Sequence, residues 1–371
     1  MTPERKHQSS TGRSRARWTA LLVWPAMVGV VLAKLAQIVS PATCTYLAPF
    51  GLLFPWSLLL LWTGLVAGLL HRKWRQSLLP MLVALWAIPE MQRTVGGMSV
   101  ASPRPEQEAA IDQTLEVVTW NVRQFDRYGW LEASDVKDQI LGTLRTTDAD
   151  IVCLQEAYLR IDFLTRPQLW SAAGVHEWHR NFGSASDPSN HYGLVTLSKH
   201  PIVGKEEIWF DEDPSNACIA TDIAIDGEDT IRVFNVHLSS NRFDPADLEA
   251  VRRGPDAAER ARVWSRLSAS WHQRSKQAEI VAAAVEESPY PVIVAGDFND
   301  GPVSYALGQF RCALDDAFSS AGTGIGATYI GKLPGLRIDY ILHSPSLAPT
   351  DFETMSTRLS DHRPVRAAFS L

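Results

Sequence analysis

The sequence predicts an α/β fold in which two packed sheets are flanked by helices, preceded by an N-terminal transmembrane helical region. Residues 115–371 alternate β-rich runs with runs of helical spacing, which is typical of sheets and helices packed in layers. Residues 18–93 are mostly apolar, as membrane-spanning helices are. The 371 residues are 46% hydrophobic and 20% charged, which is enough for one large folded domain plus an extra segment.

Composition divides the chain into four parts. Gly96, Gly97, Pro103 and Pro105 interrupt regular structure and indicate a linker. The four parts are a basic N-terminal tail (residues 1–17), a transmembrane region of two to three helices (18–93), the linker (94–114) and a soluble domain (115–371).

The transmembrane region contains three apolar runs. Residues 46–70 carry no charge and are longer than the roughly 20 apolar residues that a span needs. Residues 18–39 are interrupted by Lys34 and Gln37, and residues 78–89 are short for a span. The first run also fits a cleaved signal peptide, and the third also fits a re-entrant or interfacial segment. We favour an anchored protein because two further apolar runs come after the first.

The distribution of basic residues predicts the orientation. Basic residues precede the first apolar run and come directly after the second, whereas residues 40–48 between them carry no charge. Basic flanks stay in the cytoplasm. A third crossing then places the soluble domain outside, so we expect a multi-pass protein of a bacterial cell membrane with an extracytoplasmic domain. Without that crossing the domain stays in the cytoplasm.

Secondary structure in the soluble domain is predicted from the hydrophobic periodicity. The expected helices are residues 136–144 and 275–286, and the expected strands are residues 193–198, 217–225, 231–238 and 292–295. A charge-rich segment, residues 241–276, comes directly after the strand that ends at His237. It is either a cover that contacts headgroups or the membrane surface, or a solvated helical excursion with internal ion pairs.

The charge and cysteine content exclude some classes. A net charge of -6 argues against a uniformly basic surface for nucleic acid. The four cysteines form no CxxC pair and no zinc spacing. Cys153 lies in an apolar run, and we expect it to be a buried, inert thiol.

Six short polar clusters lie at the ends of strand-like runs. Strand ends from different parts of a chain can meet at one site, where carboxylate, amide and imidazole groups act together. The clusters read Val-Thr-Trp-Asn121, Val-Cys-Leu-Gln-Glu156, Phe-Asn-Val-His237, Val-Ala-Gly-Asp297-Phe-Asn299, Arg-Ile-Asp339-Tyr and Ser-Asp361-His362.

In this order the clusters resemble the endonuclease/exonuclease/phosphatase superfamily, which includes deoxyribonuclease-type nucleases and sphingomyelinase-like phospholipases. The resemblance covers about residues 115–371 and implies that they form a catalytic domain with a four-layer α/β sandwich fold. It also implies hydrolysis of a phosphodiester by an activated water. Such a reaction needs neutralisation of the charge that develops on the phosphoryl oxygens.

The clusters supply candidates for each chemical task. Oxygen ligands select hard cations, so Asn121, Glu156 and Asp361 are expected to hold Mg²⁺ or Mn²⁺. His362 is expected to take the proton of the attacking water. The resemblance implies that Asp339 fixes the tautomer of this histidine. A structural carboxylate at position 156 and a structural histidine at position 362 are the alternatives.

Asp297 and Asn299 lie two positions apart, so on an extended segment both point to the same face. The resemblance implies that Asp297 orients the water and that Asn299 donates to a phosphoryl oxygen. An ordinary Asx turn after a strand is the alternative. His237 is expected to donate to the phosphate or protonate the leaving oxygen, or else to be structural.

Position 123 departs from the family pattern. Many nuclease members carry Asp there, whereas Arg123 cannot bind a metal and is expected to hold a phosphate or pair with an acid. This weakens a DNA-repair function and a two-metal site.

We therefore predict a membrane-anchored, divalent-metal-dependent phosphoesterase that acts on a lipid or lipid-linked phosphodiester at the bilayer. No protein partner is predicted. The alternatives are an extracytoplasmic nuclease and a catalytically silent, membrane-tethered binding module. A lipid substrate predicts an apolar or aromatic rim, and a nucleic acid predicts a basic groove.

Overall fold

The computed structural model describes residues 11–71, 74–97, 114–131, 133–182, 191–210, 216–226, 229–331 and 335–371. Of residues 11–22, 74–75, 182, 226, 245 and 248 it describes the backbone alone. Most of the expected basic tail and of the expected linker therefore lies outside the described residues.

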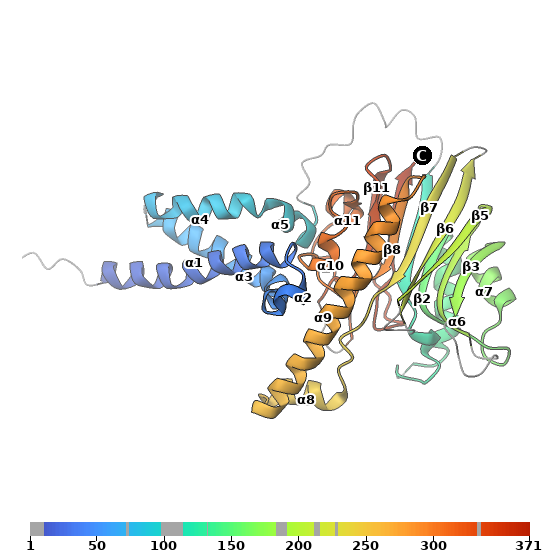
Figure 1. Ribbon diagram of the computed structural model, residues 1–371, viewed down its shortest axis with the longest axis horizontal. Coiled ribbons are helices and arrows are strands. Elements are labelled where there is room, and N and C mark those ends of the chain that lie inside the picture. Colours follow the sequence, from blue (N-terminus) through green and yellow to red (C-terminus); the bar gives the residue numbers. More distant parts are fainter. Residues whose placement is uncertain are drawn as a thin grey trace, which may run out of the picture.

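Two six-stranded sheets form the centre of the domain (Figure 1). The first runs in the order β11 (Ala348–Thr354), β12 (Val365–Ser370), β1 (Thr114–Asn121), β2 (Ile151–Leu159), β4 (His191–Ser198) and β3 (Glu177–Phe182). The second runs in the order β5 (Ile202–Trp209), β6 (Ala217–Asp226), β7 (Asp229–His237), β8 (Val292–Asp297), β10 (Asp339–His343) and β9 (Asp315–Asp316). At the centre of each sheet lies a parallel pair, β1 with β2 and β7 with β8, so these strands end at the same edge.

The strands alternate their apolar side chains between two cores. Val117 of β1 packs between the sheets, and Val118 packs under the outer helices. Helices α6 (Val136–Thr147) and α7 (Arg166–Ala173) cover the first sheet, and α9 (Ala257–Glu286) and α10 (Tyr305–Gly308) cover the second. The short helix α11 (Ala317–Ala321) adds Phe318 to the core between the sheets. This arrangement confirms the four-layer sandwich. The helices and strands expected from the sequence lie in helices and strands of the structure.

The charge-rich segment forms a helical hairpin. Helix α8 (Pro245–Arg253) starts at a capping box made by Asp244 and Asp247. Helix α9 starts at a second capping box, made by Asp256 and Glu259, and continues through the expected helix 275–286. The charge-rich segment therefore consists mainly of the helices α8 and α9.

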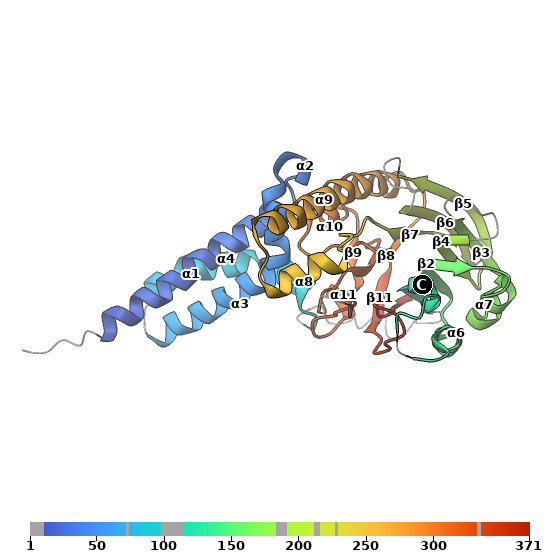
Figure 2. The ribbon, with the colours of Figure 1, turned by 90° about the horizontal axis from the view of Figure 1, so that it is seen from below.

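The N-terminal region is a bundle of α1 (Thr11–Ala36), α3 (Ala48–Leu70) and α4 (Trp74–Trp86), which projects from the domain (Figures 1 and 2). Its domain end carries α2 (Pro41–Cys44), the 3₁₀ turn η1 (Thr45–Leu47) and α5 (Ile88–Thr94). Within the described residues, one helical stretch, Pro41–Leu70, is long and apolar enough to cross a membrane. Val23–Ala36 and Gln76–Trp86 are shorter apolar helices.

The polar residues that interrupt the apolar runs pair with one another. Lys34 Nζ lies 2.7 Å from Glu90 Oε2 and donates to the carbonyl of Trp86 at 2.9 Å. Gln37 Nε2 donates to Glu90 Oε1 at 3.3 Å. These contacts satisfy a buried carboxylate and tie α1 to the junction of α4 and α5.

The bundle meets the domain through close backbone contacts. A Cβ atom at Gly51 of α3 would lie 2.2 Å from the carbonyl oxygen of Val303, and one at Gly308 of α10 would lie 2.2 Å from that of Gln37. Only glycine allows such approach. The bundle is thus held against the segment that comes after β8.

His179 links the two sheets and generates a stability prediction. Its Nδ1 lies 2.8 Å from Thr221 Oγ1, across from β3 to β6. Burial, aided by Lys205, lowers the pKa of His179 to about 4. Since the unfolded chain binds this proton below a pH of about 6.5, the free energy of unfolding should fall by roughly 1–3 kcal/mol as the pH drops from about 6.5 to about 4.

Urea unfolding of the full chain across this pH range measures the effect. The variant His179→Asn should lose this part of the pH dependence, whereas His176→Asn, at an exposed position, should keep it. Equal pH slopes for wild type and His179→Asn would contradict the assignment.

Candidate active site

The predicted site residues come together at the edge where the parallel strand pairs end. Asn121 is the last residue of β1, His237 of β7 and Asp297 of β8, and Asp339 is the first residue of β10. A cavity of about 560 Å³ opens at this edge. Six predicted residues line it: Arg123, Glu156, Asp297, Asn299, Asp361 and His362. Asn121, His237 and Asp339 are buried behind it.

Glu156 reaches the cavity because its strand is irregular there. The pairing of β2 with β4 shifts register between Leu154 and Ala157, and Glu156 adopts a left-handed φ of 51°. Burial raises the pKa of Glu156, partly offset by a hydrogen bond from Asn121, and the nearby Asp361 raises it further. The carboxylate is therefore placed where a cation would stabilise its charged form.

Asn121 bridges the two sheets. Its Nδ2 donates to Glu156 Oε1 at 3.2 Å and to Asp297 Oδ2 at 3.1 Å. Its Oδ1 accepts from the backbone N–H of Arg123 at 3.1 Å. One amide thus connects carboxylates from opposite sheets.

His362 and Asp339 form the expected pair. Nδ1 of His362 lies 2.9 Å from Asp339 Oδ2, and Nε2 lies 3.7 Å from Asp297 Oδ2. Ser360 Oγ anchors this segment by donating to the carbonyl of Asn121 at 2.8 Å. Burial alone lowers the pKa of His362, but the carboxylates of Asp339 and Asp297 outweigh it and raise the pKa.

Asp297 is the most enclosed carboxylate of the cavity. Burial raises its pKa, while His362 and His237 lower it. Nε2 of His237 lies 3.7 Å from Asp297 Oδ2 and 3.8 Å from Glu156 Oε1. His237 therefore faces two carboxylates from behind the cavity.

Arg123 lies at the mouth of the cavity. Its Nε is 3.6 Å from Asp361 Oδ2, and its guanidinium lies 4.4 Å from the ring centroid of Trp130. The pairing with an acid matches one of the two expected roles. Arg123 begins a turn, η2 (Arg123–Asp126), in which every residue has a left-handed φ.

The expected geometry of Asn299 is wrong. Strand β8 ends at Asp297, and Asn299 has a left-handed φ of 52°. Its backbone N–H donates to Asp297 Oδ1 at 2.8 Å, and its Nδ2 donates to the carbonyl of Leu238 at 2.9 Å. The Asx turn prevails over the extended conformation because it satisfies the carboxylate locally. Both side chains still line the cavity.

Backbone strain is concentrated around the cavity. Four of its lining residues have left-handed φ values although they are not glycine: Arg123, Glu156, Arg242 and Asn299. Each such conformation costs on the order of 1 kcal/mol and persists where the surrounding structure imposes it, often at functional sites.

Several residues that line the cavity were not predicted from the sequence. Trp130, Phe243 and Tyr329 line it, and the Tyr329 ring lies 5.2 Å from the His362 ring. Arg242 lines it too. The polar residues that come soon after His237 in the sequence could have indicated Arg242 as a cavity residue, whereas no sequence motif indicates Tyr329.

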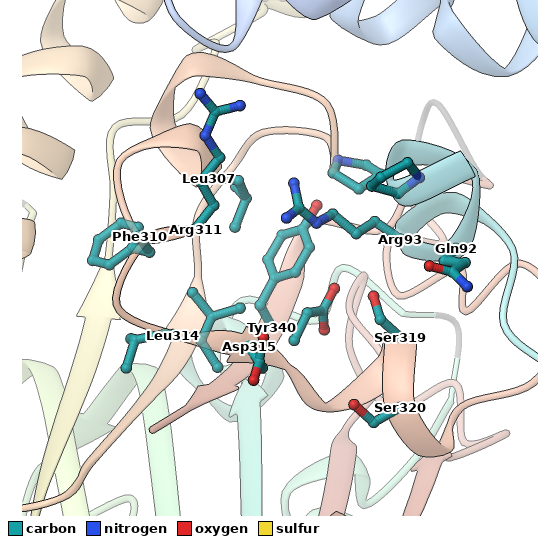
Figure 3. A pocket seen from close by; sticks show the side chains of 14 residues that line it. Gln92, Arg93, Leu307, Phe310, Arg311, Leu314, Asp315, Ser319, Ser320 and Tyr340 are labelled. Carbon is teal, nitrogen blue, oxygen red and sulfur yellow. The ribbon is translucent and has the colours of Figure 1, made fainter. Parts of the chain in front are cut away.

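A second, smaller cavity of about 170 Å³ lies between α5 and the helices α10 and α11 (Figure 3). Tyr340, Arg93 and Arg311 are among the residues that line it. It contains none of the predicted site residues, six of which line the larger cavity.

Comparison with known proteins identifies the family. The sequence profile of the Endonuclease/Exonuclease/phosphatase family matches residues 118–362. The chain belongs to this family. Its members are hydrolases, and the chain is a hydrolase of phosphodiester-type bonds.

Relatives agree with this family assignment. The chain is 27% identical over 249 residues to the uncharacterized protein YbhP of Escherichia coli K12, covering 63% of this chain and 88% of that one. The endonuclease/exonuclease/phosphatase of Bacteroides vulgatus has a similar structure, with a TM-score of 0.53, 18% identity and coverage of 70% and 99%. TDP2 of Caenorhabditis elegans has a TM-score of 0.50, 17% identity and coverage of 80% and 84%. The two structures support the fold.

The donor set fits a divalent cation of the kind that the family generally uses. Glu156 and Asp361 offer partly exposed carboxylate oxygens at the cavity, whereas the buried Asn121 directs its Oδ1 to the backbone N–H of Arg123 and its Nδ2 to the carboxylates. Such oxygen donors suit Mg²⁺ or Mn²⁺. A separate buried group, Asp297, Asp339 and His362, has ligand atoms within 4.8 Å of one another.

Removal of the Glu156 charge should weaken cation binding. The variant Glu156→Gln should bind Mn²⁺ at least about tenfold more weakly than wild type, because an ionised oxygen ligand becomes a neutral amide. Electron paramagnetic resonance of free Mn²⁺ during titration measures this without any substrate. Glu207→Gln, an exposed carboxylate on β5, is the matched control and should bind as wild type does. Unchanged affinity in Glu156→Gln would exclude this carboxylate as a ligand.

Proposed function

We propose that the protein is a membrane-anchored, divalent-metal-dependent phosphodiesterase that acts on a lipid or lipid-linked substrate. The observation that carries the catalytic part is the meeting of Glu156, Asp297, Asp361 and the Asp339–His362 pair at one cavity. These groups come from both sheets, and four carboxylates gathered at one cavity repel one another unless donors or a cation compensate them.

Each group has a task in the proposed reaction. Glu156 and Asp361 would hold the cation, with Asn121 positioning Glu156 through its Nδ2. The bound cation would supply neutralisation of the charge on the phosphoryl oxygens. The facing pair of Asp297 and His362 orients the water and takes its proton, since Asp297 Oδ2 and His362 Nε2 lie 3.7 Å apart.

The neighbouring groups support this pair. Asp339 fixes the tautomer of His362 through Nδ1. Arg123 at the mouth contacts the substrate phosphate, for which it exchanges its pairing with Asp361. His237 stabilises the Asp297 and Glu156 carboxylates from behind.

The exposed surface of the bundle supports membrane anchoring. Of the apolar stretch in Pro41–Leu70, 28% is buried inside the protein. Trp56, Leu59 and Val66 of α3 and Leu82 of α4 are exposed. Soluble monomers rarely expose apolar patches of this extent. At about 1.5 Å per residue, the 23 residues of α3 match a hydrocarbon core of about 30 Å.

The direction of the helices supports an extracytoplasmic domain. Arg13, Arg15 and Arg17 lie in the first turns of α1, and His71 comes directly after α3. Both ends lie at the tip of the bundle far from the catalytic domain (Figure 1). Helix α4 returns toward the domain and would supply the third crossing that the orientation requires.

The cavity rim supports a lipid substrate. Trp130, Phe243, Tyr329, Leu336 and Ile338 give it an aromatic and apolar character. A single-stranded nucleic acid is the second candidate, because aromatic rings beside Arg123 and Arg242 also suit stacked bases and phosphates.

Activity of the full chain in detergent tests the catalytic proposal. The variant His362→Ala should lose a factor of about 10²–10⁴ in Mg²⁺-dependent turnover of bis-p-nitrophenyl phosphate, since the proton-accepting pair is broken. His176→Ala, at an exposed position, should retain wild-type turnover. Retained activity in His362→Ala would refute the assignment. A parallel panel of phospholipids and single-stranded DNA separates the two substrate classes.

Labelling in intact cells tests the topology. Cys44 and Cys312 are first replaced by Ser, which leaves two buried cysteines. A membrane-impermeant maleimide should then label a Glu207→Cys variant from outside, and a His71→Cys variant only after permeabilisation. The reverse pattern would place the domain in the cytoplasm.

A further inference from the structure

The hairpin formed by α8 and the first half of α9, residues 245–271, has no role in the proposed reaction. It belongs to a locally cationic segment: residues 241–276 contain eight Lys or Arg and five Asp or Glu, although the chain has a net charge of -6. We call this element the α8–α9 hairpin.

Ion pairs hold the two helices of the α8–α9 hairpin together. The buried Asp247 of α8 lies 2.8 Å from Arg262 Nε and 2.9 Å from Arg266 Nη1 of α9. At the tip, Arg253 pairs with Glu259. These pairs neutralise much of the charge and make the hairpin a fixed unit.

Two cations and an apolar side chain remain at the tip. Arg252 and Arg260 are exposed, and neither pairs with a carboxylate of the described residues. Arg260 Nη1 donates to the carbonyl of Pro255, which leaves the charge of its guanidinium unneutralised. Val251 is 48% exposed beside them. Such a combination suits the headgroup region of an anionic bilayer, where cations meet phosphates and apolar groups enter the interface.

The α8–α9 hairpin lies at the level where the bundle leaves the domain. Tyr46 of η1 stacks on Trp264 of α9 with ring centroids 5.2 Å apart, and Thr45 Oγ1 lies 3.3 Å from His272 Nε2. The tip extends roughly 10 Å beyond Trp264 along α9, at 1.5 Å per residue, on the side of the domain from which the bundle projects (Figure 1). Tyr46 is 72% exposed, as an aromatic residue at a membrane interface is.

The base of α9 holds a wall of the catalytic cavity. The buried Arg274 donates to the carbonyl of Ser239 at 2.7 Å, to Asn241 Oδ1 at 3.0 Å and to Asp300 Oδ2 at 3.3 Å. Residues 240–243 line the cavity. One continuous helix therefore connects the tip with the catalytic wall.

We propose that the α8–α9 hairpin binds anionic lipid headgroups of the bilayer that anchors the bundle, through Arg252 and Arg260. This binding holds the wall formed by residues 240–243 at the membrane surface, beside the substrate. The inference rests on the membrane anchoring of the proposed function.

Fluorescence of the full chain in lipid nanodiscs tests the inference without measuring activity. In a Cys44→Ser, Cys312→Ser background, an environment-sensitive dye is attached to a Val251→Cys variant. Its emission should shift to the blue when phosphatidylglycerol is added to phosphatidylcholine. A Val203→Cys variant on β5, far from the bundle, should not respond.

Removal of the two arginine charges at the tip provides a second test of the inference. With Arg252→Ser and Arg260→Ser together, the phosphatidylglycerol content needed for half the shift should rise several-fold, or the shift should be lost, because two surface cations are removed. The matched control, Arg145→Ser with Lys205→Ser, removes two exposed cations elsewhere and should leave the response unchanged.

A dye at Leu59→Cys on α3 separates the two possible failures. Water-like emission at Leu59 would overturn the anchoring and the α8–α9 hairpin inference with it. Apolar emission at Leu59, with no phosphatidylglycerol response at Val251, would overturn the hairpin inference alone. A larger response at Val251 to single-stranded DNA than to phosphatidylglycerol would assign the hairpin to nucleic acid instead.

Discussion

Asp297 and Asp339 are buried close together at the seam between the two sheets, and the cost of this burial constrains the whole site. Two carboxylates in a low-dielectric interior destabilise each other unless donors or cations compensate them. His362 lies between them, and Asn121 donates to Asp297 from the opposite sheet. The candidate catalytic groups therefore also compensate one another's burial, so the site and the docking of the sheets are stabilised together.

A polar network behind the cavity fixes the position of the sheets. Gln155 of β2 donates through Nε2 to Asn235 Oδ1 at 2.8 Å and to Thr119 Oγ1 at 2.9 Å. Asn235 of β7 donates in turn to the carbonyls of Leu154 and Val195 in the other sheet. Apolar packing alone would allow the sheets to slide, whereas each of these bonds requires one register. The network thus sets the separation of Glu156 from Asp297.

The sequence predicted the groups at strand ends because strand periodicity and the order of the motifs are local properties that survive folding. It did not predict how Asn299 points, because a turn in which Asp297 accepts from the backbone competes with extension of the strand beyond Asp297. It also missed Phe243 and Tyr329, since loops bring them to the cavity and their positions depend on distant contacts. Local sequence patterns therefore identified the candidate catalytic groups. They did not identify the other residues that line the cavity, on which the choice of substrate would depend.

The same limit applied to the N-terminal bundle, where pairing explains the polar residues that interrupt the apolar runs of the sequence. Lys34 weakened the first apolar run and Glu90 ended the third, yet the two side chains meet at 2.7 Å. A buried charge pair at the domain end of the bundle orients α5 relative to α1, and Gly51 brings α3 against Val303, just beyond the Asp297 motif. Because these contacts are made by backbone and buried groups, the bundle does not act as a flexible tether. If it is embedded in a bilayer, the catalytic cavity is held at one height and one angle above that surface, which limits the substrates to those presented there.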